Sequence, residues 1–146
     1  MVGPDRCCFV DTNIWLYAFV DSGEPAKSAR AKAILQRSSI AVSPQVVTEV
    51  CVNLIKKAQF PEPEVRRLVT AFYHRYTVVA ADLEVQIEAS MLREAHSFSF
   101  WDSLIVASAL AAGADVLYSE DMQDGLEVGG MRILNPLVSK SGNPNP

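Results

Sequence analysis

Cys7-Cys8-Phe9-Val10-Asp11-Thr12-Asn13 is the segment from which the expected architecture follows. Four residues that can be buried run directly into a carboxylate, and a helical pattern begins at once. This order predicts a short central strand that delivers Asp11 to the rim of a parallel sheet. In open α/β sheets, ligands bind beyond the carboxyl ends of the strands. The positions of the other carboxylates therefore decide whether this rim is a functional site.

Short apolar runs alternate with helical patterns through the rest of the chain. Further strands are expected at residues 40–42, 77–79 and 115–119, with a candidate edge strand at 131–134. Helices are expected at residues 12–20, 26–36, 44–58, 64–76, 83–96 and 103–112. Strands that alternate with helices in this way predict an α/β domain with a mainly parallel sheet.

One expected helix follows Asp82, a residue type that caps helix N-termini. Its apolar side is predicted to consist of Leu83, Ile87, Met91 and Leu92, which recur at helical spacing. These side chains are therefore expected to face the core.

Length and composition indicate one globular domain at residues 1–137, followed by a flexible tail at 138–146. The three cysteines fit no disulfide or zinc pattern, which is typical of buried apolar residues in a reducing compartment. No signal-peptide pattern is seen, and the longest charge-free apolar run, residues 104–114, is 11 residues long. A membrane span needs about 20 residues, so a soluble cytoplasmic protein with no membrane partner is expected.

Carboxylates follow several expected strands or begin the helices that come next. They are Asp11, Glu49, Asp102, Asp121 and Asp124. Each has an ordinary structural explanation, as a helix N-cap (Asp11, Asp102), as part of a solvated helix face (Glu49) or as a turn residue. Together they indicate more, because carboxylates brought close together repel one another unless a cation neutralises them. Oxygen ligands suit a hard ion such as Mg²⁺ or Mn²⁺.

Four motifs in this order resemble those of the PIN domain, and more narrowly those of a VapC-type toxin of a prokaryotic toxin–antitoxin pair. The motifs are Phe9 to Asn13, Pro44 to Glu49, Trp101 to Ala109 and Leu117 to Gly125, and the resemblance covers residues 7 to 137. It implies a three-layer α/β/α sandwich around a mainly parallel sheet of four or five strands. It also implies a metal-dependent endoribonuclease that uses Mg²⁺, with Mn²⁺ as a substitute.

The resemblance also implies roles for individual residues. Asp11 and Asp102 match metal ligands, Glu49 matches a third acidic member, and Asp121 matches a fourth, which is also a candidate ligand. Three further residues match positions that orient or support these carboxylates, namely Asn13, Ser119 and Asp124. Gly125 stands where the family often has an aromatic residue. The expected reaction is hydrolysis of an RNA phosphodiester, which leaves a 5′-phosphate and a 3′-hydroxyl.

Toxins of this kind usually pair as homodimers and are silenced by a small antitoxin, so both partners are expected here. Aromatic residues are candidates for an interface, although burial in the core is the more ordinary fate for most of them. They are Trp15, Tyr17, Phe19, Phe72 and Tyr73.

The net charge of −4 argues against a nucleic-acid partner when it is taken alone. Setting aside the five carboxylates of the expected site leaves 13 basic against 12 acidic residues, a balance of +1. The basic residues that could then contact RNA phosphates are Lys56, Lys57, Arg66, Arg67 and Arg75. The alternative for each is an ordinary solvated helix surface.

Other functional classes fit the sequence less well. A phosphatase with Asp11 as nucleophile would need a second Asp where this chain has Asn13. A response-regulator receiver domain would need an acidic pair before the phosphoacceptor strand and a late lysine, and neither is evident. A non-catalytic interaction or RNA-binding module remains open, with the carboxylates serving only as helix caps and surface groups.

Overall fold

The strand β1 (Cys7–Val10) lies inside a six-stranded sheet, between β2 (Ser39–Val42) and β4 (Val116–Tyr118). The full strand order is β3-β2-β1-β4-β6-β5, where the other strands are β3 (Thr77–Val78), β5 (Glu127–Val128) and β6 (Met131–Leu134). All pairings are parallel except the β5–β6 hairpin. This computed structural model describes residues 6–36 and 39–138, so nearly all of the expected tail lies outside the described residues.

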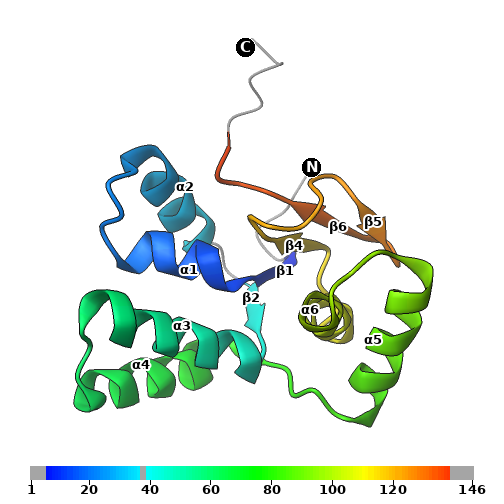
Figure 1. The fold of residues 1–146 in the computed structure, drawn as a ribbon, viewed down its shortest axis with the longest axis horizontal. Coiled ribbons are helices and arrows are strands. Elements are labelled where there is room, and N and C mark those ends of the chain that lie inside the picture. The colour runs from blue at the N-terminus through cyan, green and yellow to red at the C-terminus, as the bar shows by residue number, and fades with distance from the viewer. Residues whose placement is uncertain (1–5, 37–38, 139–146) are drawn as a thin grey trace.

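Helices cover both sides of the sheet. They are α1 (Thr12–Phe19), α2 (Pro25–Leu35), α3 (Pro44–Ala58), α4 (Glu62–Arg75), α5 (Leu83–Ala95) and α6 (Phe100–Ala111). Figure 1 shows α1 to α4 on one side of the central strands, and α5 and α6 on the other. The expected three-layer α/β architecture is therefore confirmed. None of the helices in residues 6–36 and 39–138 is both long and apolar enough to cross a membrane.

Apolar burial fixes the centre of the fold. Phe9 and Val10 are completely buried, as is Trp15, whose indole N–H donates to the carbonyl oxygen of Val10 at 3.0 Å. The indole also packs edge-on against Phe72, with ring centroids 4.8 Å apart. Trp15 and Phe72 are therefore core residues rather than interface aromatics, whereas Phe19 and Tyr73 are exposed.

Two predictions about strands need correction. The sheet has six strands rather than four or five, because the two-residue β5 was not expected. The segment 131–134 is not an edge strand, since β6 lies between β4 and β5. Gly129 and Gly130 have φ values of 54° and 82°, which allow the tight turn that folds β5 back onto β6.

The prediction for the apolar side of α5 is also wrong in part. Leu83, Ile87 and Met91 are 75%, 55% and 56% exposed, respectively. The helix instead buries Val85, Ala89 and Leu92, of which only the last was expected. Two apolar stripes at helical spacing coexist on this helix, and packing against α6 selects the one that contains the small Ala89.

The start of α6 lies earlier than expected. The helix begins at Phe100, and its N-cap is Ser99, whose hydroxyl oxygen accepts from the backbone N–H of Asp102 at 3.0 Å. Asp102 therefore lies in the first turn of the helix instead of immediately before it. Because Ser99 caps the helix, capping does not account for the carboxylate of Asp102.

Candidate active site

The ends of β1 and β4 bring Asp11 and Ser119 together. The backbone N–H of Asp11 donates to the carbonyl oxygen of Tyr118 at 3.0 Å, and that of Ser119 donates to the carbonyl oxygen of Leu134 at 3.0 Å. Sheet-like pairing therefore continues one residue beyond each strand. The buried Ser119 hydroxyl donates to a carboxylate oxygen of Asp11 at 3.0 Å, which fixes the side chain at the sheet edge.

Two side chains in the first turn of α1 donate hydrogen bonds to two further carboxylates. The Thr12 hydroxyl donates to Glu49 at 3.1 Å, across 37 positions of sequence. The Asn13 side-chain amide donates to Asp121 at 2.9 Å, across 108 positions. Glu49 comes from α3 and Asp121 from the loop after β4. The segment that follows β1 thus gathers acidic groups from distant parts of the chain.

These side chains surround one hollow of about 210 Å³, called here the strand-end hollow. It contains four of the five carboxylates singled out in the sequence. The complete lining consists of Asp11, Thr12, Asn13, Gln45, Glu49, Asn53, Trp101, Asp102, Ile105 and Asp121. The four acids come from four different elements, because Asp102 is contributed by α6.

The carboxylates of this hollow affect one another electrostatically. The pKa of Asp11 is raised from 3.8 to about 6, mainly by burial, while hydrogen bonds from the Thr12 backbone and Ser119 oppose the shift. The charges of Asp102 and Glu49 raise it further. Burial also raises the pKa of Asp102, against a hydrogen bond from Ser99 and with a contribution from the charge of Asp121. Such mutual repulsion favours the binding of a cation.

The donor chemistry fits a hard divalent cation, since every charged side chain of the strand-end hollow is a carboxylate and the other oxygen-bearing side chains are amides or a hydroxyl. The geometry is more open than a closed ligand shell. Within residues 6–36 and 39–138, no group of three Asp, Glu, His or Cys side chains is arranged to hold a metal ion.

Asp124 lies elsewhere. It is exposed, and one carboxylate oxygen accepts from the backbone N–H of Asn135 at 2.9 Å. This bond ties the loop after β4 to the segment that follows β6. Asp124 does not line the strand-end hollow, and its proposed support of the other carboxylates stays a prediction.

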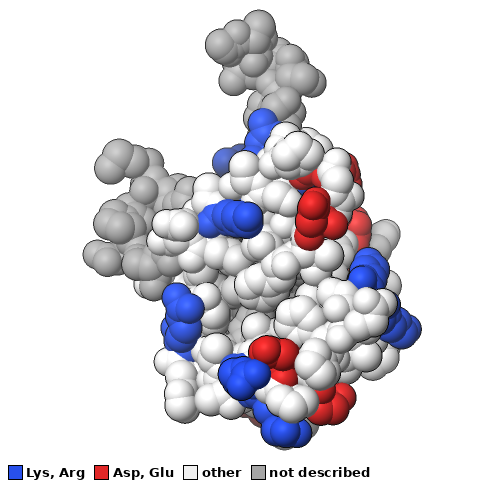
Figure 2. Space-filling model, turned by 90° about the vertical axis from the view of Figure 1, so that its left-hand side faces the viewer, with Lys and Arg blue, Asp and Glu red and all other residues white. Residues whose placement is uncertain are grey.

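The basic residues singled out in the sequence are exposed and dispersed. Lys57 lines a small hollow that shares Asn13 with the strand-end hollow, whereas Arg66 and Arg67 line a separate one on α4. Arg67 also pairs with Glu64 at 3.0 Å. Figure 2, which looks onto the side where α1 to α4 lie, shows Lys and Arg in separate groups with Asp and Glu among them. An RNA-binding role for these residues stays a prediction.

Sequence reasoning missed two residues of this site. No site role was predicted for Thr12, although its place between Asp11 and Asn13 could have indicated one. Trp101 was not predicted as a site residue either, yet it is 64% exposed and lines the strand-end hollow. Its position immediately before Asp102 was the available signal.

The structure is that of an α/β domain whose mainly parallel sheet has helices on both sides. Carboxylates gather beyond the ends of its strands and form an acidic site rich in oxygen atoms. The family model described as PIN domain matches residues 8–124, and the chain belongs to the PIN domain family. No protein with a curated description matches the chain in sequence.

Solved structures show the same fold. A chain of a toxin–antitoxin complex from Klebsiella pneumoniae has a TM-score of 0.68 at 21% identity, covering 88% of this chain and 97% of that one. VapC20 from Mycobacterium tuberculosis, a toxin that cleaves the sarcin-ricin loop, has a TM-score of 0.63 at 19% identity, covering 78% and 89%. VapBC2 from Rickettsia felis, bound to a DNA fragment from its promoter, has a TM-score of 0.61 at 16% identity, covering 88% and 97%.

Proposed function

We propose that this chain is a divalent-cation-dependent endoribonuclease and the toxin of a toxin–antitoxin pair. One observation carries the proposal. Asp11, Glu49, Asp102 and Asp121 arrive from four separate elements in one hollow at the carboxyl edge of the sheet. Membership of the PIN domain family and the similarity in fold to a toxin that cleaves RNA support the same function.

The residues that would hold the cation are Asp11, Asp102 and Asp121, with Glu49 as the fourth acidic group. When bound, Mg²⁺ or Mn²⁺ supplies Lewis acidity toward water and toward the phosphodiester. The chain itself positions the carboxylates: Ser119 and the Thr12 backbone hold Asp11, and the Thr12 side chain holds Glu49. Such supporting hydrogen bonds fix the orientation of ligands at metal sites.

The proposed reaction is hydrolysis. A water oxygen forms a bond to phosphorus, the bond from phosphorus to the 3′-oxygen breaks, and that oxygen takes up a proton. The products are a 5′-phosphate and a 3′-hydroxyl. The raised pKa of Asp11 suits a site whose carboxylates need a cation before all of them can be ionised together.

The proposed protein partners are a small antitoxin and a second copy of this chain. Several similar structures are toxin–antitoxin complexes, and we infer a small antitoxin protein and a homodimeric state for this chain. Size-exclusion chromatography with light scattering would measure the mass of the purified protein, which is expected to be twice the chain mass of 16.0 kDa.

The central experiment compares the wild type with Asp11→Asn on total RNA, with Mg²⁺ or with EDTA, and maps the new RNA ends. We expect cleavage by the wild type in Mg²⁺ only, with 5′-phosphate ends, and none by the variant. Full cleavage by Asp11→Asn, or cleavage that persists in EDTA, would contradict the proposal.

A non-catalytic interaction or RNA-binding module is the second candidate, because no group of three Asp, Glu, His or Cys side chains in the described residues is arranged to hold a metal ion. Titration calorimetry separates the two. A nuclease should bind Mg²⁺ or Mn²⁺ in the millimolar range or tighter, with loss of the heat signal in Asp102→Asn. A module whose carboxylates serve only structure should show no such binding.

A further inference from the structure

The chain contains two tryptophans in opposite environments. Trp15 is completely buried, hydrogen-bonded through its indole N–H and surrounded by aromatic rings. Trp101 is 64% exposed and lies at the strand-end hollow. Leaving so large an apolar ring in water forgoes the free energy that burial would give, so the fold itself does not explain the position of Trp101.

The neighbouring ring does not explain it either. Phe100 is also exposed, but it belongs to the interface between α5 and α6, because the Arg93 guanidinium lies 4.1 Å from the centre of its ring. Arg93 also donates to the Ser103 hydroxyl at 2.7 Å, which fixes the start of α6. Phe100 therefore has a structural partner, and it does not line the strand-end hollow.

The ring of Trp101 has a free face. Its contact with Phe100 is edge-on, with centroids 5.9 Å apart and an interplanar angle of 72°. A contact of this kind leaves most of the indole uncovered, in keeping with the 64% exposure of Trp101. A flat group that enters the hollow beside Asp102 could therefore stack on this ring.

Two hollows that share lining residues with the strand-end hollow provide space for the rest of a nucleic-acid strand. One of about 250 Å³ shares Asp102 and Asp121 with the strand-end hollow and is lined by His96 and Phe98. One of about 130 Å³ shares Asn13 and is lined by Tyr17 and Lys57. Three hollows therefore adjoin one another at the carboxylates. Each of the two further hollows is lined by an aromatic ring and by a side chain that can donate a hydrogen bond, His96 in one and Lys57 in the other.

We propose that Trp101 stacks on an unpaired nucleobase next to the scissile phosphate and so positions the RNA strand beside the acidic group; the inference rests on the proposed ribonuclease function. Stacking on an exposed aromatic ring needs a base whose face is free, and duplex RNA presents no such base. The interaction tolerates any base, because every base has a π-face. Stacking on Trp101 thus adds to the affinity for RNA next to the acidic group, whose carboxylates repel the negatively charged phosphate.

The test uses the contrast between the two tryptophans. In an Asp11→Asn background, which keeps the RNA intact, a single-stranded RNA oligonucleotide should quench the emission of the exposed Trp101 and leave that of Trp15. Trp101→Ala should weaken binding on the order of 10- to 100-fold. Trp101→Tyr should keep binding within a few-fold and abolish the quenching, because it preserves the stacking ring and removes the indole. A duplex of the same sequence should bind more weakly and quench little.

Phe100→Ala is the matched control, since it removes an exposed ring from the same helical turn but not from the hollow. It should bind RNA within about twofold of its parent, as expected for a ring that contacts no base. Circular dichroism checks that each variant folds. Binding by Trp101→Ala equal to that of the parent, or no quenching by single-stranded RNA, would overturn the proposal and leave Trp101 as a contact for a protein partner.

Cleavage assays distinguish failure of this inference from failure of the proposed function. If the otherwise native chain cleaves RNA, Trp101→Ala should raise KM with a smaller effect on kcat, and Trp101→Tyr should restore KM. Cleavage by the wild type that is indifferent to Trp101→Ala overturns stacking and leaves the ribonuclease intact. Quenching without any cleavage by the wild type overturns the ribonuclease and supports stacking in an RNA-binding module. Neither quenching nor cleavage overturns both.

Discussion

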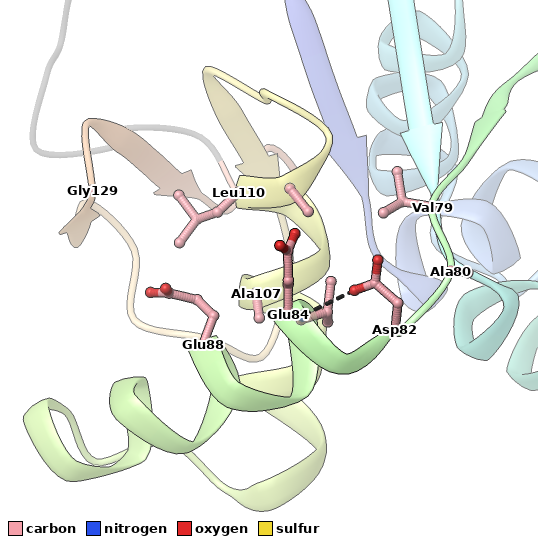
Figure 3. Close-up of a pocket in the computed structure, with 10 residues that line it drawn as sticks. Val79, Ala80, Asp82, Glu84, Glu88, Ala107, Leu110 and Gly129 are labelled. Carbon is pink, nitrogen blue, oxygen red and sulfur yellow. Dashed lines mark hydrogen bonds between the residues drawn. The ribbon is translucent and has the colours of Figure 1, made fainter.

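Two acidic hollows in the described part of the chain lie at opposite ends of α6, and they differ in how their acids are assembled. The second, called here the distal hollow, is larger at about 640 Å³ and is lined by Asp82, Glu84 and Glu88 beside apolar side chains. Figure 3 shows Glu84 and Glu88 extending from α5 in different directions, with Asp82 hydrogen-bonded at the start of that helix. Neither a large volume nor the presence of several acids is therefore enough to identify a functional site.

The origin of the acids does separate them. Those of the distal hollow come from one helix and its N-cap, where acidic residues are ordinary because they favour a helix start. Those of the strand-end hollow come from four elements, and three of them accept hydrogen bonds from Ser119, Thr12 and Asn13. Local helix chemistry explains the first set. It does not explain the second, whose members meet only because the sheet brings them together.

The largest expected difference between the hollows is in catalysis. Asp102→Asn should lower RNA cleavage by at least about 100-fold, because removal of groups that merely support metal ligands already costs about 10- to 100-fold. Initial rates on a defined RNA in Mg²⁺ would measure the effect. Circular dichroism should show an unchanged fold, and a rate within threefold of the wild type would contradict the assignment of Asp102.

A smaller effect is expected from the residues that hold the carboxylates. Ser119→Ala removes the hydroxyl that donates to Asp11 and should lower cleavage or apparent Mg²⁺ affinity by about 10- to 100-fold. A titration of the cleavage rate against Mg²⁺ concentration distinguishes the two effects. Ser90→Ala, at an exposed position of α5, serves as the control and should titrate like the wild type.

Stability should respond to pH at the strand-end hollow. The folded state holds the Asp11 proton up to about pH 6, whereas the unfolded chain releases it near the ordinary pKa of 3.8. The free energy of unfolding therefore falls as the pH rises from about 4 to 6. Asp11→Asn removes this fall and should be more stable than the wild type at pH 7.5 without metal, by up to about 3 kcal/mol, with no such advantage at pH 3.5.

Denaturant unfolding at the two pH values would measure this difference. Addition of Mg²⁺ at pH 7.5 should raise the stability of the wild type more than that of the variant, since a ligand stabilises the state that binds it. A variant that is less stable than the wild type at pH 7.5 would show that the carboxylate of Asp11 serves mainly to cap α1.

The smallest effect is expected at the distal hollow. The double substitution of Glu84→Gln and Glu88→Gln should leave cleavage within about twofold of the wild type, since surface substitutions away from special features have small effects. The same RNA assay measures it. A loss of cleavage comparable to that of Asp102→Asn would show that the distal hollow also takes part in catalysis.

The strand ends could be predicted from the sequence because each is a local event. An apolar run that stops at Asp11, or at Ser119 after Tyr118, needs only neighbouring residues to be recognised. The buried face of α5 could not be predicted in this way, since two apolar stripes compete and tertiary packing selects between them. The partners of Thr12 and Asn13 lie 37 and 108 positions away, so no local pattern indicates these hydrogen bonds.

The hydrogen bonds that extend the sheet beyond β1 and β4 also set how the site moves. The backbone amide of Asp11 is locked between strands and should exchange its hydrogen with solvent only when the central sheet opens. Asp121 is exposed in a loop, which can open locally at a much smaller cost. A ligand that binds both Asp11 and Asp121 contacts one side chain at a rigid strand end and one in a loop that opens easily. Part of its binding free energy is therefore offset by the cost of ordering the loop. Slowed hydrogen exchange around Asp121 would then be the earliest sign that the site is filled.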